Sequence, residues 1–127
     1  MSKAAVMNLQ DPMNLNRWIV GTPPNVSTSS EFHSEQIQIA HVKNPERKSF
    51  FSSEVKHWHT PPIEEYILLL EGTLKVRVDN DIIILKPLQL LKIPPKMPHK
   101  ILDYSTPLHY FLLRTPISRE ETKVITE

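Results

Sequence analysis

The chain has 127 residues and is close to charge balance, with 15 Lys and Arg against 14 Asp and Glu, and it has no cysteine. This length predicts a single domain, and the balanced charge gives no basis for binding nucleic acid or an anionic membrane surface. The lack of cysteine excludes disulfides and thiolate metal sites. No segment has the apolar length of a membrane span or resembles a signal peptide, so we expect a soluble, cytoplasmic protein.

The N-terminal segment predicts an arm with one short helix. Asp11 is a suitable N-cap residue and Pro12 suits the first helical position. Leu15, Trp18 and Ile19 would then share one face of the helix.

Most of the remaining chain predicts short β-strands. Apolar and polar side chains alternate in several segments, and turn-forming residues separate them. Evenly spaced short strands favour an antiparallel sandwich or barrel. The expected strands cover 35–42, 50–59, 65–71, 73–78, 82–85, 88–93, 100–103 and 108–114. The chain therefore predicts three parts: an N-terminal arm and loop over 1–34, a β-barrel over 35–115, and a polar C-terminal tail over 116–127.

Three histidines and one glutamate have the spacing of a metal site. His57 and His59 are two residues apart, so in a strand they point to the same face. Glu65 begins the next predicted strand, and His99 follows a Pro-rich turn in a third segment. A barrel can bring these four side chains around one ion, at the bond lengths of about 2.0–2.2 Å that imidazole and carboxylate ligands make.

Glu64 is an alternative to Glu65 as the carboxylate ligand. The alternation of the strand separates them, because Glu65 shares a face with Ile67 and Leu69, whereas Glu64 shares the opposite face with Tyr66. This phase favours Glu65 as the side chain that points into the barrel.

These residues resemble the first motif of the cupin family, which reads HxH, a few residues, Glu, six residues and Gly. His57, His59, Glu65 and Gly72 match it, with a gap before Glu65 that is one residue longer than usual. Phe51 stands where that motif would open with Gly.

The second cupin motif is matched in part. Pro94 and His99 stand at its proline and histidine positions. Leu88, Lys96 and Asp103 replace the Gly, Gly and Asn that the family shows. The resemblance covers roughly residues 50–114 and implies an all-β, cupin-type double-stranded β-helix, also called a jelly-roll barrel.

The resemblance also implies a function class. Three neutral imidazoles and one carboxylate suit one divalent transition metal ion, which is Fe, Mn, Ni, Zn or Cu. With a redox metal the protein would be a dioxygenase-type oxidoreductase acting on a small polar molecule. The alternatives are an isomerase or epimerase that uses the metal as a Lewis acid on a sugar or keto acid, and a cupin that binds a small molecule without chemistry. A barrel that keeps its histidines in a hydrogen-bonded network without metal is also open.

Four further residues are candidates for substrate binding. Lys96 and Arg114 carry charges that would suit a carboxylate or phosphate near the mouth of the barrel. His41 and His109 lie in predicted strands and would line the cavity if their faces point inward. For each of the four, the competing interpretation is an ordinary core or surface residue.

The sequence also predicts a homodimer. Tyr66, Leu68 and Leu70 make one face of their strand apolar, and such a face is rarely left exposed. The N-terminal arm with Trp18 and Ile19 is a candidate to lie across the neighbouring copy.

Overall fold

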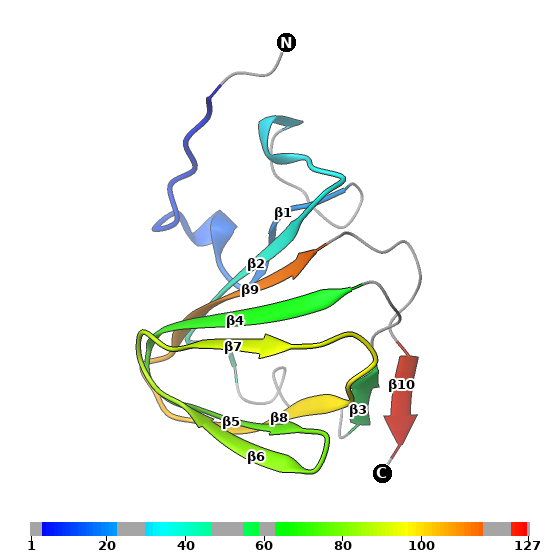
Figure 1. The fold of residues 1–127 in the computed structure, drawn as a ribbon. Helices are drawn as coiled ribbons and strands as arrows, with labels where there is room; N and C mark the ends of the chain where they lie inside the picture. Colours follow the sequence, from blue (N-terminus) through cyan, green and yellow to red (C-terminus); the bar gives the residue numbers. More distant parts are fainter. Residues whose placement is uncertain (1–3, 23–29, 47–54, 59–62, 116–122, 127) are drawn as a thin grey trace.

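The computed structural model describes residues 4–22, 30–46, 55–58, 63–115 and 123–126, with the backbone alone for 55–58 and 123–126. Two five-stranded antiparallel sheets face each other (Figure 1). Their strand orders are β1-β2-β9-β4-β7 and β10-β3-β8-β5-β6. The elements are η1 (Pro12–Asn14), β1 (Arg17–Val20), η2 (Ser30–Phe32), β2 (Gln38–Lys43), β3 (Val55–Trp58), β4 (Glu64–Glu71), β5 (Leu74–Val78), β6 (Asp81–Leu85), β7 (Leu90–Ile93), β8 (His99–Tyr104), β9 (His109–Thr115) and β10 (Lys123–Thr126).

The interior between the sheets follows from the alternation of the strands. In β5, Leu74, Val76 and Val78 are buried, whereas Lys75 is exposed and Arg77 is half-buried, as the sequence predicts. The buried cluster takes residues from each strand from β4 to β9 and from Leu108, just before β9. It includes Ile67, Leu69, Leu74, Val76, Leu85, Leu91, Ile93, Tyr104, Leu108 and Tyr110. The expected jelly-roll architecture is therefore confirmed.

The N-terminal segment differs from the predicted helix. Asp11 does cap the turn, because its side chain accepts a hydrogen bond from the Met13 N–H, but the turn is a 3₁₀ helix of three residues. Asn16 then adopts a positive φ of 55°. Trp18 and Ile19 lie in strand β1, which pairs with β2, so a shared helical face with Leu15 is wrong. Backbone pairing with β2 satisfies more donors and acceptors than an isolated short helix can.

Two segments outside the predicted barrel contribute strands to it. β1 falls within the predicted arm and adds an edge to the first sheet. β10 falls within the predicted tail and pairs with β3 at the edge of the second. The sheets thus extend beyond the segment 35–115 at both ends.

Gly72 joins β4 to β5 in a conformation that favours glycine. Its φ is +87°, and a Cβ added there would lie 2.5 Å from the carbonyl oxygen of Pro107 and 3.0 Å from that of Ser105. The turn can approach the β8–β9 connection this closely only without a side chain.

Candidate metal and ligand site

Strand β4 directs Glu65 into the interior. Glu65 is 4% exposed and shares its face with the buried Ile67 and Leu69. Glu64 lies on the opposite face, where it accepts a hydrogen bond from the Tyr66 hydroxyl, which raises the pKa of Tyr66. The predicted phase of this strand is therefore confirmed, and Glu65 is the carboxylate that faces the core.

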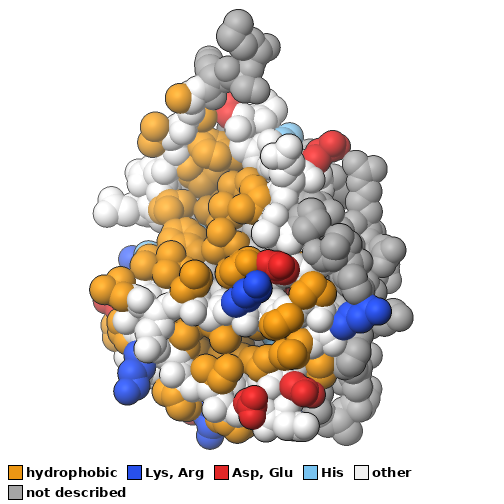
Figure 2. Space-filling view, in the orientation of Figure 1, with side chains coloured by type: hydrophobic (Ala, Val, Ile, Leu, Met, Phe, Trp, Pro, Cys, Tyr) orange, Lys and Arg blue, Asp and Glu red, His pale blue; other side chains and the backbone are white. Residues whose placement is uncertain are grey.

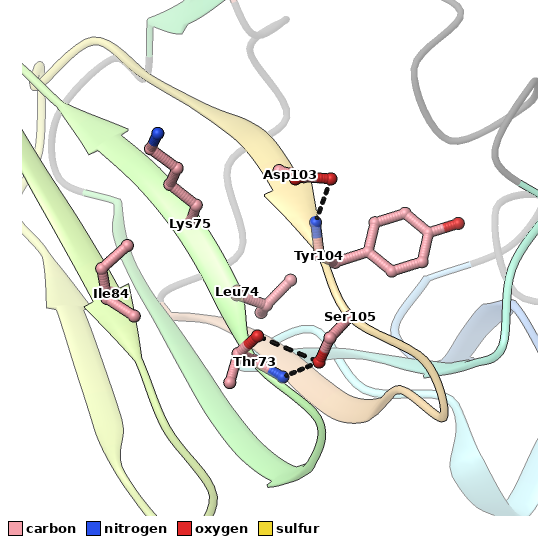
Figure 3. A pocket seen from close by; sticks show the side chains of 7 residues that line it. All are labelled: Thr73, Leu74, Lys75, Ile84, Asp103, Tyr104 and Ser105. Atoms are coloured by element: carbon pink, nitrogen blue, oxygen red, sulfur yellow. Dashed lines mark hydrogen bonds between the residues drawn. The ribbon is translucent and has the colours of Figure 1, made fainter.

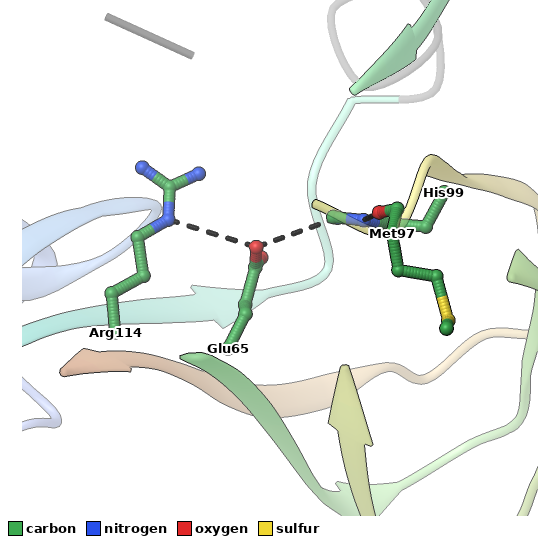
Figure 4. Close-up of polar contacts among 4 residues, drawn as sticks. All are labelled: Glu65, Met97, His99 and Arg114. Carbon is green, nitrogen blue, oxygen red and sulfur yellow. Dashed lines mark hydrogen bonds and ion pairs between the residues drawn. The ribbon is translucent and has the colours of Figure 1, made fainter. Parts of the chain in front are cut away.

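His99 approaches Glu65 from the other sheet. It is the first residue of β8 and is 5% exposed. Its Nε2 lies 3.4 Å from Oε2 of Glu65, and its Nδ1 lies 3.2 Å from the carbonyl oxygen of Met97 (Figure 4). Since a carbonyl only accepts, Nδ1 carries the proton and donates it to Met97.

This arrangement fits a bound cation. With its proton on Nδ1, a neutral His99 presents the Nε2 lone pair to a carboxylate oxygen, so two acceptors face each other in the interior. Either a proton or a metal ion must lie between them. The hydrogen bond from the far ring nitrogen to a backbone carbonyl is the usual support of a metal-bound histidine, and the 3.4 Å spacing suits two ligands with bonds of about 2.1 Å.

The two remaining predicted ligands are placed only in part. The backbone of β3 pairs with β8 so that His57 lies directly opposite His99. The side chain of His57 and the whole of His59 lie outside the described residues. The side chains that the structure does describe include no group of three or more metal-ligating residues. The four-ligand set therefore stays a prediction.

Arg114 reaches the same carboxylate from β9. Its Nε lies 3.8 Å from Oε2 of Glu65, and the two residues are register partners in neighbouring strands. The guanidinium carbon lies 5.0 Å from the ring centroid of Trp18 in β1, an aromatic face that attracts cations. Figure 4 shows Glu65 between Arg114 on one side and His99 on the other.

Trp18 and Tyr110 are site neighbours that the sequence analysis did not find. Trp18 pairs with Ala40 of β2, and Tyr110 is buried beside Leu69 of β4. Burial, aided by Glu65 and Tyr104, raises the pKa of Tyr110, so its hydroxyl stays protonated at neutral pH. The signal that could have found Tyr110 is the alternation of β9, because Tyr110, Leu112 and Arg114 are each two residues apart and therefore share one face of the strand.

Two residues at glycine positions of the second cupin motif have the positive φ that usually favours glycine. Leu88 has φ 66° and Lys96 has φ 63°, and these are the positions where the second cupin motif expects Gly. Lys96 is exposed in the turn before β8. Its part in ligand binding stays a prediction.

His41 and His109 lie on the outer face of the first sheet, not in the interior where they were candidates to line the cavity. His41 is the register partner of Phe111, one residue out of phase with the inward Leu112 and Arg114. The Nε2 atoms of the two histidines are 2.7 Å apart, and Nδ1 of His41 lies 2.7 Å from the carbonyl oxygen of Asn14. They form a cluster of their own under the N-terminal segment.

A hollow of about 240 Å³ lies elsewhere, on the outer side of β5 and β8 (Figure 3). The hydroxyl of Thr73 donates to that of Ser105 at one end of it. Its lining residues are Thr73, Leu74, Lys75, Ile84, Asp103, Tyr104 and Ser105. Neither Glu65 nor His99 takes part, so this hollow is separate from the candidate site.

Solved structures with the same fold include cupins. An RmlC-like cupin family protein with a double-stranded β-helix fold from Methanocaldococcus jannaschii matches with a TM-score of 0.51 and 17% identity, over 65% of this chain and 72% of the other. KdgF from Halomonas sp. matches with a TM-score of 0.54 and 16% identity, over 68% of this chain and 74% of the other.

A third structure aligns over more of the chain. The DMSP lyase DddQ from Ruegeria pomeroyi matches with a TM-score of 0.60 and 19% identity, over 89% of this chain. The alignment spans about half of the lyase, 53% of its length. At such identities the likeness concerns the fold.

No protein-family model matches the chain, and no curated protein matches it. Among the described residues, no helix is long and apolar enough to cross a membrane.

Proposed function

We propose that this chain, which has the cupin fold, binds one divalent transition metal ion through His57, His59, Glu65 and His99 and uses it to act on a small polar molecule. Oxygenation of that molecule ranks first, because the set of three histidines and one glutamate resembles that of several cupin dioxygenases. Lewis-acid isomerisation or epimerisation is the second candidate, and ligand binding without chemistry is the third.

The observation that carries the proposal is the orientation of His99 toward Glu65. The Nδ1 bond to Met97 leaves Nε2 of a neutral ring as an acceptor, 3.4 Å from a buried carboxylate oxygen. The pairing of His57 with His99 supports a third ligand at the same place. A bound ion of this kind supplies either redox chemistry with O₂ or polarisation of a carbonyl.

The residues around the carboxylate have separate roles in this proposal. Glu65 and His99 hold the ion from opposite sheets. Tyr110 offers a protonated hydroxyl in the interior, since its pKa is raised. Arg114 provides a positive charge beside Glu65. The apolar core that surrounds these groups excludes water and strengthens their electrostatic interactions.

Metal titration of chelator-treated protein tests this function. Calorimetry with Mn²⁺ and Zn²⁺ should give one ion per chain for the wild type, and His99→Ala and Glu65→Gln should weaken binding by at least about tenfold, since even losing the partner of a ligand costs 10–100-fold. Glu64→Gln is the matched control and should bind as the wild type does. Loss in Glu64→Gln with retention in Glu65→Gln would contradict the proposed ligand set.

Oxygen dependence separates the three candidate activities. Fe- and Mn-loaded protein should be incubated with catechols, β-diketones and keto-sugars while oxygen uptake and product mass are followed. Uptake matched by a mass gain supports oxygenation, and conversion without oxygen supports isomerisation. Recovery of a tightly bound, unchanged ligand would support the binding role.

The homodimer stays a prediction. The half-buried Leu68 and Leu70 lie on the outer face of β4. Exposed apolar residues also occur in β6, in β7 and in the turn between them: Ile82, Ile84, Leu88 and Leu90. Hydrophobic side chains gather on the face of the molecule drawn in Figure 2. Light scattering at micromolar concentration measures the mass directly, and a value near 14.7 kDa would contradict the dimer. Trp18 and Ile19 are not available to cross to a neighbour as an arm, because they belong to the chain's own sheet.

A further inference from the structure

The guanidinium of Arg114 is held inside the barrel with few partners. The side chain is 22% exposed, and its Nε is buried without a hydrogen bond. Within the described part of the chain, its interactions are the 3.8 Å ion pair with Glu65 and the contact with the ring of Trp18. Neither satisfies the two terminal nitrogens, which Figure 4 shows pointing away from Glu65.

A guanidinium in this state is suited to a ligand. It carries five donors in a planar fork, and the fork matches the two oxygens of a carboxylate. The Nε donor is buried without an acceptor, and the terminal nitrogens of this 22% exposed side chain can exchange water for an incoming pair of oxygens. The ring of Trp18 covers one face of the guanidinium, which leaves its edge to meet the ligand.

The charge of the interior indicates a single negative charge on that ligand. Among the strands whose side chains are described, the inward-facing positions carry one Lys or Arg, which is Arg114. Lys75 and Lys92 are exposed on outer faces. Glu65 balances part of that charge, so a phosphate dianion would meet more repulsion here than a carboxylate, which carries one charge.

We infer that the substrate is a short carboxylate. The terminal nitrogens of Arg114 bind its carboxylate group, and its reactive carbon lies toward His99. This inference rests on the proposed function for the metal end of the site. Nε of Arg114 and Nε2 of His99 lie 3.8 and 3.4 Å from the same oxygen of Glu65, so these two nitrogens are at most about 7 Å apart and one small molecule can meet both residues. A 2-hydroxy or 2-oxo acid offers a carboxylate to the guanidinium and a second oxygen to the metal ligands.

Trp18 is a positioning residue in this site. It contacts Arg114 rather than the ligand, and it holds the plane of the guanidinium through a cation–π interaction. Trp18→Leu should weaken carboxylate binding, and Trp18→Phe should restore most of it because an aromatic face returns. A residue that only filled space would be replaced equally well by Leu and Phe.

Lactate and its neutral amide, lactamide, test the inference as matched probes. They are titrated into metal-free protein and into Zn²⁺-loaded protein, and binding is followed by NMR. In both forms lactate should bind at least about tenfold tighter than lactamide, as expected for charge-assisted hydrogen bonds. In the wild type, the Trp18 indole and Arg114 Nε–H signals should move with lactate.

Two arginine variants remove the same charge from different places. Arg114→Gln should reduce lactate affinity by about tenfold or more and leave lactamide unaffected. Arg77→Gln, on the outer side of β5, changes the net charge equally and should alter lactate affinity less than about twofold. Arg114→Lys keeps the charge but lacks the fork, and it should bind lactate more weakly than the wild type.

The outcomes separate this inference from the metal proposal. Equal binding of lactate and lactamide, or no lactate binding, overturns the carboxylate site even if calorimetry finds one metal ion per chain. Selective lactate binding by metal-free protein supports it even if no metal binds. Should Arg114→Gln fail to fold, unmoved Arg114 and Trp18 signals in the wild type would still overturn the inference.

Discussion

At the scale of single residues, several turns place residues other than glycine in the left-handed region of backbone conformation. Leu88 and Lys96 have φ of 66° and 63° at motif positions where cupins show glycine, and Gly72 has φ +87°. A side chain at positive φ costs roughly 1–2 kcal/mol per residue. The chain therefore keeps the motif's backbone while giving up stability, which pairing and packing supply elsewhere.

Leu88→Gly should stabilise the protein. Leu88 is 80% exposed, so its side chain contributes little packing, and glycine relieves the left-handed strain. We expect an increase of about 1 kcal/mol in the free energy of unfolding, measured by urea denaturation. Leu88→Ala keeps a Cβ and is the control, with little expected change. A loss of stability in Leu88→Gly would show that this side chain is needed, for example in a contact between copies.

Gly72→Ala should have the opposite effect. The added Cβ would meet the backbone oxygens of Pro107 and Ser105, and neither is the end of a flexible side chain. The strained φ alone costs roughly 1–3 kcal/mol, so the urea midpoint should fall clearly. Thr73→Ala, next in sequence, removes one exposed hydrogen bond and should cost under about 1 kcal/mol. Equal effects of the two changes would argue against the close approach at Gly72.

At the scale of elements, the N-terminal segment is fastened to the outside of the first sheet. Asn16 exchanges two hydrogen bonds with the backbone of Lys43, and the carbonyl of Asn14 accepts from Nδ1 of the fully buried His41. Nε2 of a neutral His41 must then accept the proton of His109 Nε2. Strand β1 follows directly, so this fastening also positions Trp18 against Arg114.

This histidine pair predicts a pH dependence of stability. Burial lowers the pKa of His109, with His41 and Lys43 adding to the effect and Glu71 opposing it. The folded state therefore binds this proton less readily than the unfolded state, whose histidine titrates near 6.5. The contribution of His109 to the free energy of unfolding is complete above pH 6.5. It is lost as the pH falls through the lowered pKa of the folded state, by at most about 1.4 kcal/mol per pH unit.

Urea denaturation between pH 5 and 7.5 measures this effect. The slope below pH 6.5 should be smaller in His109→Gln than in the wild type. His33→Gln, which removes an exposed imidazole outside the pair, is the control and should keep the wild-type slope. A slope that His109→Gln leaves unchanged would assign the acid sensitivity to other groups.

The sequence predicts most of the strands, because alternation in β4 and β5 is long enough to set both the strand and its phase. It fails at β1, where four residues are too few to show a period and the Asp11-Pro12 signal is that of a helix. It also shows which residues share a face without showing which face is inside, so His41 looked equivalent to an inward residue. The contact of Trp18 with Arg114 depends on pairing through β2, and no local pattern contains it.

At the scale of the whole molecule, the candidate metal site joins the two sheets. Glu65 belongs to β4 in the first sheet, whereas His99 and His57 belong to β8 and β3 in the second. An ion held by all of them would oppose the separation of the sheets. Because the unfolded chain lacks this arrangement, binding free energy becomes folding free energy.

Metal should therefore raise the melting temperature. At a free metal concentration 100 times the dissociation constant, linkage predicts about 2.7 kcal/mol of added stability. Calorimetric melting with and without Zn²⁺ measures it, and a chelator should reverse the shift. His99→Ala should show no shift at the same concentration. An unshifted wild type that nevertheless binds metal would place the ion at a site which survives unfolding.

The register of strand β9 positions both the interior site around Arg114 and the outer histidine pair of His41 and His109. Its inward residues include Tyr110 and Arg114, its outward residues include His109 and Phe111, and it pairs on both sides, with β2 and β4. Inserting or deleting one residue within β9 would turn every later side chain of the strand to the other face, and such a change before Arg114 would send the guanidinium outward. Diversification of this protein should thus proceed here by substitution alone, while changes of chain length are confined to the loops.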